Sequence, residues 1–117
     1  MDDAIVQSGP PSVPREQVIE RIRGYLETTD VQRAILFGSY ATGHADLASD
    51  VDLLLIERTD LPFVERGLAH LPLFRLGFGL DLLVYTAAEF ERMQPEGNPL
   101  IARTRQEGIE IYARSQG

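Results

Sequence analysis

Apolar residues recur along the chain with two different spacings, and these spacings predict alternating helices and strands. From Pro14 and Arg15 onward, apolar side chains return every three or four residues, as on one face of a helix. They are Val18, Ile19, Ile22, Tyr25 and Leu26. Residues 32–37, 50–56 and 80–85 instead contain short apolar runs, which are typical of strands. The run from Leu53 to Ile56 is uninterrupted, which predicts a central strand buried on both faces.

A helix is expected between the second and third strands. Pro62 is well placed to open it, and Pro72 should break or kink it. Its apolar residues are expected to point inward, toward the sheet. They are Phe63, Val64, Leu68 and Leu71.

The remaining segments are separated by residues that favour turns and caps. Gly77 and Gly79 predict a turn before the third strand. Thr86 and Glu89 have the spacing of a capping box, which predicts a short helix with Phe90 and Met93 on its apolar side. Asn98 and Pro99 predict the start of a last helix that ends at Gly108, before a short strand over residues 109–112. The alternation predicts an α/β (or α+β) class with one sheet flanked by helices.

Two parts of unequal size are expected. Residues 1–14 are rich in serine, glycine and proline and predict a flexible N-terminal arm. Residues 15–117 form the predicted folded domain, and their length suits a single domain.

Composition narrows the classes of function. The formal net charge is -7, so general binding to nucleic acid is not expected. The chain has no cysteine, which excludes disulfides and thiolate metal sites and fits a cytoplasmic location. No signal peptide and no membrane-spanning apolar run is expected. Solubility is the simpler explanation of the acidity, and a carboxylate cluster that binds a divalent cation is the alternative explanation for part of it.

Three aspartates carry the most specific chemical signal. Asp50 and Asp52 lie two residues apart at the start of a strand, so both carboxylates point to the same face. Asp81 stands near the start of the next strand, and neighbouring strands would bring all three together. Clustered carboxylates repel one another unless a hard cation neutralises them, and Mg²⁺ accepts carboxylate and phosphate oxygens readily. Two such ions could serve the attacking and leaving oxygens of a phosphoryl transfer.

Gly38 and Ser39 follow the first strand and predict a phosphate cradle. A glycine there lets the backbone approach a ligand closely, and the N–H groups that open a helix face an anion. Each feature alone has a simpler interpretation. A Gly-Ser pair is usually a turn, and an Asp-x-Asp pair is more often a solvated strand start than a metal site. The combination, in this order, is much more specific.

Two stretches resemble a known family. The sequence Gly38-Ser-Tyr-Ala-Thr-Gly43, followed by Ser49-Asp-Val-Asp-Leu53, is similar to the signature of the DNA polymerase beta superfamily of nucleotidyltransferases. More narrowly, the chain resembles the stand-alone minimal nucleotidyltransferases (MNT) from about residue 15 onward. The resemblance implies a mixed sheet flanked by helices and transfer of a nucleoside monophosphate from a triphosphate with Mg²⁺. It implies that Asp50 and Asp52 bind metal and that Asp81, also a metal ligand, helps to activate the acceptor hydroxyl. Gly38 and Ser39 match the pair that binds phosphate.

The resemblance also implies a partner. Proteins of the MNT type are often encoded beside HEPN proteins, which are small helical ribonuclease toxins. An antitoxin of this kind would transfer AMP from ATP to a tyrosine of the toxin. A chain of this size has no room for an acceptor-binding domain, so a partner or a second copy would have to supply that surface. A homo-oligomer and a hetero-oligomer both remain open.

Thr42 departs from the family pattern, because many minimal members carry an arginine at this position, just before the second glycine. Arg66, Arg75 and Arg103 are candidate substitutes, although a surface role is the simpler interpretation of each. His44 and His70 lie too far apart for a metal motif, and His70 is expected to be structural. Tyr40 is equally compatible with stacking on a base and packing on the sheet.

Three functions follow as hypotheses. The first is a nucleotidyltransferase that modifies a protein partner, which requires the complete set of aspartates. The second is a binding antitoxin that neutralises its partner by covering it, with transfer lost or secondary. The third and weaker is a transferase for small molecules, of the antibiotic-modifying type.

Overall fold

The computed structural model describes residues 9–94 and 97–114, so most of the predicted arm lies outside the described residues. Nine elements follow one another within the described residues. They are α2 (Arg15–Leu26), β1 (Arg33–Phe37), α3 (Ser39–Thr42), β2 (Val51–Ile56), η1 (Phe63–Arg75), β3 (Leu80–Tyr85), α4 (Ala87–Met93), α5 (Pro99–Glu107) and β4 (Ile109–Ala113). Val13, just before α2, is buried, and its carbonyl accepts a hydrogen bond from the Tyr40 hydroxyl. None of the described helices combines the length and the apolar character needed to span a bilayer.

The four strands form one mixed sheet in the order β3-β2-β1-β4. β2 runs parallel to β3, whereas β1 is antiparallel to both β2 and β4. β2 therefore lies inside the sheet, as its continuous apolar run predicts, and β3 forms one edge. The predicted class, a small mixed sheet flanked by helices, is confirmed.

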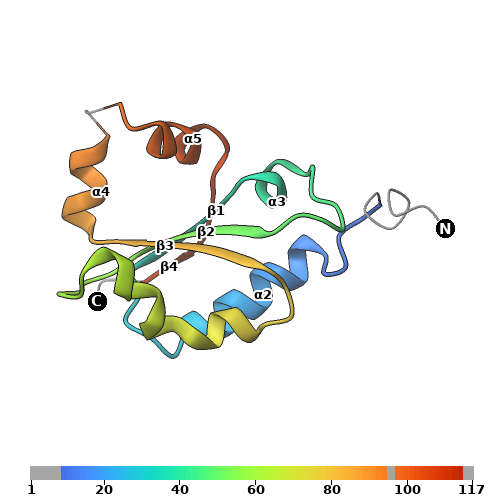
Figure 1. The fold of residues 1–117 in the computed structure, drawn as a ribbon, viewed down its shortest axis with the longest axis horizontal. Coiled ribbons are helices and arrows are strands. Elements are labelled where there is room, and N and C mark those ends of the chain that lie inside the picture. The colour runs from blue at the N-terminus through green and yellow to red at the C-terminus, as the bar shows by residue number, and fades with distance from the viewer. Residues whose placement is uncertain (1–8, 95–96, 115–117) are drawn as a thin grey trace.

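Helices cover both faces of this sheet (Figure 1). On one face, α2 buries Val18, Ile22 and Leu26 in the larger apolar cluster. On the other face, α4 and α5 contribute Phe90 and Ile101 to a second cluster. The short helix α3 follows β1 directly at the end of the sheet where β2 and β3 begin (Figure 1).

The predicted caps of the last two helices are confirmed. The Thr86 side chain accepts a hydrogen bond from the Glu89 N–H, and the Glu89 carboxylate accepts one from the Thr86 N–H. The Asn98 side chain caps α5 by accepting a hydrogen bond from the Leu100 N–H. These interactions connect residues two or three positions apart, so local sequence is sufficient to predict them.

The expectation that the segment after Pro62 turns its apolar residues inward is wrong. Phe63, Val64, Leu68 and Leu71 are all exposed. The segment is a 3-10 helix that is interrupted at His70, two residues before Pro72. The side chains it buries are Arg66, His70 and Leu73.

Distant partners explain why two polar side chains of η1 face inward. Arg66 donates to both carboxylate oxygens of Glu89, at 2.6 and 3.1 Å, and to the backbone carbonyls of Leu61 and Val84. His70 contacts the Glu57 carboxylate and forms a 2.7 Å hydrogen bond with the Tyr25 hydroxyl. Burial of a charged group is tolerated when it is paired and hydrogen-bonded. The expected structural role of His70 agrees with these contacts.

Candidate active site

The three aspartates lie at one end of the sheet, where β2 and β3 begin. Asp52 is the register partner of Asp81 on β3 and of Phe37 on β1. Asp50 precedes β2 by one residue, next to the turn that leads into β3. Asp50 and Asp81 are exposed and Asp52 is half-buried, so the carboxylates line a surface that a ligand can reach.

Two glycines make room for these carboxylates. A Cβ atom on Gly38 would lie 2.1 Å from Asp52 Oδ2, and one on Gly79 would lie 2.0 Å from Asp50 Oδ1. Both distances are far shorter than a van der Waals contact, so neither position accepts a side chain without displacing an aspartate. Gly38 also has a φ of 73°, which favours glycine. The role of Gly38 fits its predicted closeness to a site, whereas Gly79 was expected only to form a turn. The closeness of Gly79 to Asp50 depends on how β2 pairs with β3, and the sequence offers no local signal for this pairing.

The electrostatic environment of Asp52 is set by its neighbours. Burial raises the pKa of Asp52, and the negative charge of Asp81 raises it further. The Arg103 guanidinium opposes these effects. Asp52 and Asp81 are register partners on neighbouring parallel strands, so their side chains lie on the same face of the sheet. Two carboxyl groups held this close are suited to sharing a proton or a cation.

Arg103 is the cation that α5 brings to this site. Its guanidinium carbon lies 5.8 Å from the centre of the Phe37 ring, and Phe37 stands directly beside Asp52 in the sheet. The Nε atom donates to Glu107 at 2.6 Å, which orients the side chain along the helix. Of the three arginines considered from sequence, Arg66 on η1 forms an ion pair with Glu89 on α4. Arg103 is the one with an electrostatic effect on Asp52.

The residues around α3 have mostly structural contacts. Tyr40 is buried and donates to the Val13 carbonyl, so it packs in the core rather than presenting its ring to solvent. Thr42 Oγ1 donates to the backbone carbonyls of Gly38 and Ser39, at 3.3 and 3.4 Å. His44 is exposed, and its Nδ1 lies 3.0 Å from Thr42 Oγ1. No side chain caps the N-terminus of α3 at Gly38.

The carboxylates suit Mg²⁺ by their chemistry. Their donors are all oxygens, which are the ligands that this ion prefers. Within residues 9–94 and 97–114, however, no three acidic, histidine or cysteine side chains are already arranged to hold a metal ion. The donor atoms therefore fit the ion, but the carboxylates would have to move closer together to bind it.

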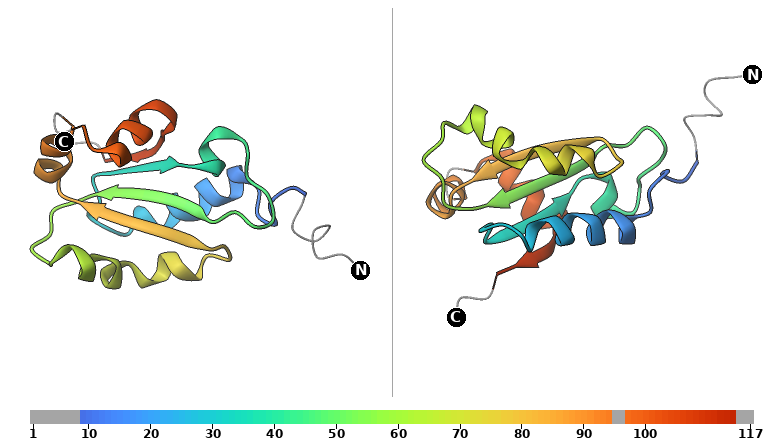
Figure 2. Two further views of the ribbon diagram at one scale, coloured as in Figure 1. Left: turned by 45° about the horizontal axis from the view of Figure 1, so that its top comes forward. Right: turned by 90° about the horizontal axis from the view of Figure 1, so that it is seen from below.

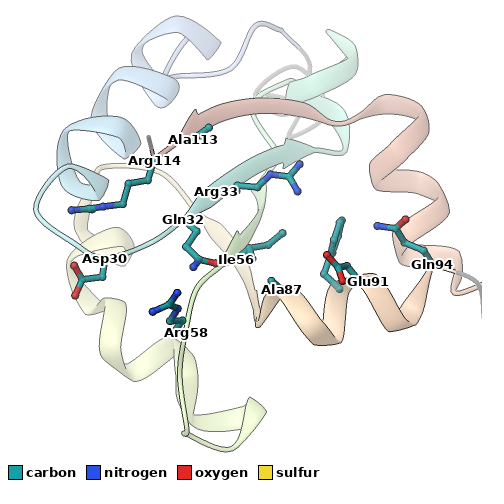
Figure 3. Close-up of a pocket in the computed structure, with 11 residues that line it drawn as sticks. Asp30, Gln32, Arg33, Ile56, Arg58, Ala87, Glu91, Gln94, Ala113 and Arg114 are labelled. Carbon is teal, nitrogen blue, oxygen red and sulfur yellow. The ribbon is translucent and has the colours of Figure 1, made fainter. Parts of the chain in front are cut away.

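One hollow in the surface lies where β1 begins and β2 ends, which is the opposite end of the sheet from the aspartates. Figure 3 shows the residues that line it. It has a volume of about 880 Å³ and contains three arginines, Arg33, Arg58 and Arg114. Arg33 is paired with Glu110, and Arg114 donates to the Thr29 carbonyl. The hollow also contains Asp30 and Glu91, so its charges are largely balanced. None of the aspartates of the candidate site borders it.

Comparison with known proteins finds a family match over the middle of the chain. Residues 19–76 match the sequence profile described as the nucleotidyltransferase domain. This segment includes Gly38, Ser39, Asp50 and Asp52, whereas Asp81 and Arg103 lie beyond it. Over residues 19–76 the chain is therefore similar to the nucleotidyltransferase domain family. Among curated proteins, none is similar enough in sequence to count as a relative.

Several solved structures share the fold at low sequence identity. A chain of a toxin-antitoxin complex with AMP-PNP has a TM-score of 0.60 and 21% identity, covering 84% of this chain and 75% of that one. A protein from Sulfolobus solfataricus described as a nucleotidyltransferase has a TM-score of 0.55 and 18% identity, with 89% and 84% covered. A chain of the complex of a tri-AMPylated Shewanella oneidensis HEPN toxin with its MNT antitoxin has a TM-score of 0.55 and 18% identity, with 86% and 73% covered. At these identities the likeness establishes the fold alone.

Proposed function

We propose that this chain is a Mg²⁺-dependent nucleotidyltransferase that transfers AMP from ATP to a hydroxyl group of a HEPN-type partner, and so acts as an antitoxin. The single observation that carries the proposal is the arrangement at one sheet end, where Asp52 and Asp81 are register partners beside Gly38. The proteins with this fold include an antitoxin complex with AMP-PNP and one with an AMPylated toxin. A tyrosine hydroxyl is the proposed acceptor, and the cytoplasm is the proposed location.

In the proposed reaction, the acceptor oxygen attacks the α-phosphorus of ATP. A bond forms between this oxygen and phosphorus, the bond to the bridging oxygen breaks, and pyrophosphate leaves. The proton of the acceptor hydroxyl passes to the Asp81 carboxylate, which is exposed and therefore accessible to a partner. When bound by Asp50, Asp52 and Asp81, Mg²⁺ would neutralise charge on the phosphates and lower the pKa of the acceptor.

Gly38 and Ser39 are proposed to hold the triphosphate. The backbone at Gly38 is free of a side chain on the side of Asp52, and the N-terminus of α3 begins there without a side-chain cap. Arg103 is proposed to supply the positive charge that Thr42 does not. Its place above Phe37 puts a guanidinium on the same side of the sheet as Asp52.

Replacement of Asp52 tests the transferase. The chain is mixed with ATP, Mg²⁺ and the product of the neighbouring gene, and the mass of each intact protein is measured. We expect the partner to gain one or more AMP units, and Asp52→Asn to lose this transfer while its unfolding midpoint stays within a few degrees of wild type. Transfer by Asp52→Asn at the wild-type rate would contradict the proposal.

Replacement of Arg103 tests the proposed phosphate contact. Arg103→Ala should lower kcat/KM for ATP by roughly tenfold, because a charge-assisted hydrogen bond to phosphate is lost. Arg105→Ala is the matched control, since Arg105 is an exposed arginine on the same helix. Equal effects of the two variants would show that only the general charge of α5 matters.

A second function is favoured by Thr42. Its side chain carries no positive charge, and its hydroxyl is hydrogen-bonded within α3. In this case the chain neutralises its partner by binding alone. Asp52→Asn would then protect cells from the partner as well as wild type does, with no mass gain on either protein.

A further inference from the structure

Two arginines of α2 contact the two segments that lie beside the aspartates. Arg15 is the first residue of α2, and its Nη1 atom donates to the backbone carbonyls of Ala41, at 3.1 Å, and Tyr40, at 3.4 Å. Further along the same helix, Arg21 Nη1 donates to the Leu76 carbonyl at 2.8 Å. Both views of Figure 2 show that α2 begins at the end of the sheet where α3 and the turn before β3 also lie. One helix therefore holds both segments.

The segment that Arg15 holds places Gly38 against Asp52. α3 has only four residues, so its last carbonyls lie beyond the reach of its own N–H groups, and a cation is favourable at this end of a helix. The Gly38 carbonyl accepts hydrogen bonds from the N–H groups of Ala41, at 3.0 Å, and Thr42, at 3.1 Å. A Cβ atom on Gly38 would lie 2.1 Å from Asp52 Oδ2, so a small shift of α3 changes the space around this carboxylate.

The segment that Arg21 holds places a second glycine against a second aspartate. Gly77 has a φ of 101°, and a Cβ atom there would lie 2.9 Å from Arg21 Nη1. Glycine is therefore needed both for the backbone and for the approach of the guanidinium. Next along the turn, the Gly79 carbonyl accepts a hydrogen bond from the Val51 N–H at 2.9 Å, and a Cβ atom on Gly79 would lie 2.0 Å from Asp50 Oδ1. The turn thus connects α2 to the carboxylate on the other side of the start of β2.

We propose that Arg15 and Arg21 are positioning residues of the candidate site. They hold the two glycine-containing segments that set where the carboxylates of Asp52 and Asp50 stand. Each acts through the backbone that it holds, because its contacts there are to carbonyl groups. This inference rests on the proposed function, because ATP with Mg²⁺ is the ligand that these carboxylates and Gly38 are proposed to bind. Loss of either arginine should loosen one segment and leave the other in place.

Binding of AMP-PNP with Mg²⁺ to the chain without a partner, measured by isothermal titration calorimetry, tests the effect on the site. Arg15→Ala should weaken binding by about tenfold, because two hydrogen bonds from a partly buried charged group are lost. Arg21→Ala should weaken it by about threefold, because its contact is exposed to water. Arg23→Ala is the matched control, since Arg23 is exposed on the same helix and its side chain has no hydrogen bond or ion pair among the described residues. Its affinity should stay within about 1.5-fold of wild type.

Amide hydrogen exchange followed by NMR shows which segment each substitution loosens. Arg15→Ala should speed exchange at Ala41 and Thr42 by about fivefold or more and leave Val51 unchanged, whereas Arg21→Ala should speed exchange at Val51 alone. Arg15→Lys should restore most of the protection and affinity, because a single nitrogen makes both contacts and an ammonium group can also donate to carbonyls. Equal acceleration over the whole chain would mean general destabilisation and would contradict the inference. If Arg15→Ala does not fold, Arg15→Met replaces it, because methionine keeps most of the apolar stem without the donor.

The outcomes separate this inference from the proposed function. If wild type transfers AMP and both alanine variants bind AMP-PNP as wild type does, the inference is wrong and the transferase stands. If wild type binds AMP-PNP without transferring AMP, and both variants bind it more weakly than Arg23→Ala, the inference stands and the transferase is wrong. Faster exchange without weaker binding would show that the arginines only stabilise their segments, and it would contradict the inference. If wild type does not bind AMP-PNP, both are wrong.

Discussion

The helices α2 and η1 cover the same face of the sheet but use their apolar residues in opposite ways. α2 buries Val18, Ile22 and Leu26 completely and exposes its polar residues. η1 exposes Val64 and Leu68, and buries Arg66 and His70. The periodicity of the two segments is similar, so the pattern alone does not distinguish them. The comparison shows that periodicity predicts that a helix has two faces, whereas the partners available in the fold determine which face turns inward.

The largest effect is expected in the core of α2. Ile22→Ala should reduce the free energy of unfolding by about 3 kcal/mol, because it removes fully buried methyl groups and leaves a cavity. Urea denaturation followed by circular dichroism measures the change. A loss below about 1 kcal/mol would mean that α2 contributes less to the core than its burial indicates.

An intermediate effect is expected at the polar inner face of η1. Arg66 and the Thr86 N–H stabilise the charged form of Glu89 and lower its pKa from 4.5 to about 2. A carboxylate with a lowered pKa stabilises the fold above its unfolded pKa and loses this contribution as the pH falls through the folded value. Glu89→Gln should therefore cost about 2 kcal/mol at pH 7, and the difference from wild type should shrink as the pH falls from about 5 to about 2.

This pH dependence is checked by urea titrations at several pH values. Glu91→Gln is the matched control on the same helix, because Glu91 is exposed and has no ion pair among the described residues. It should change the unfolding free energy by less than about 0.5 kcal/mol at every pH. If the loss of unfolding free energy caused by Glu89→Gln stayed constant down to pH 2, the charge of the carboxylate would not be what binds Arg66.

The smallest effect is expected on the outer face of η1. Leu68→Ser should change the unfolding free energy by no more than about 0.5 kcal/mol, because the side chain is mostly in contact with water. A loss greater than 1 kcal/mol, measured as for Ile22→Ala, would mean that this side chain is buried in solution and that the contrast with α2 does not hold.

The candidate site was only partly predictable. The spacing of Asp50 and Asp52 places them on one strand, and the glycine after β1 indicates a close approach, so these residues can be chosen from sequence. Asp81 requires a guess that its strand is a neighbour, which the parallel pairing of β2 and β3 bears out. Gly79 and Arg103 are different, since their closeness to aspartates depends on the strand register and on where α5 packs.

The sequence by itself determined the features that depend on near neighbours along the chain. The strands, the capping box at Thr86 and Glu89, and the cap at Asn98 involve residues a few positions apart, and their energetics are local. Only the tertiary structure decided which way η1 faces and which arginine stands beside Asp52. The side-chain partners of Arg66 and His70 lie between 13 and 45 residues away. Burial of a charge depends on such distant partners, and a periodic pattern contains no information about them.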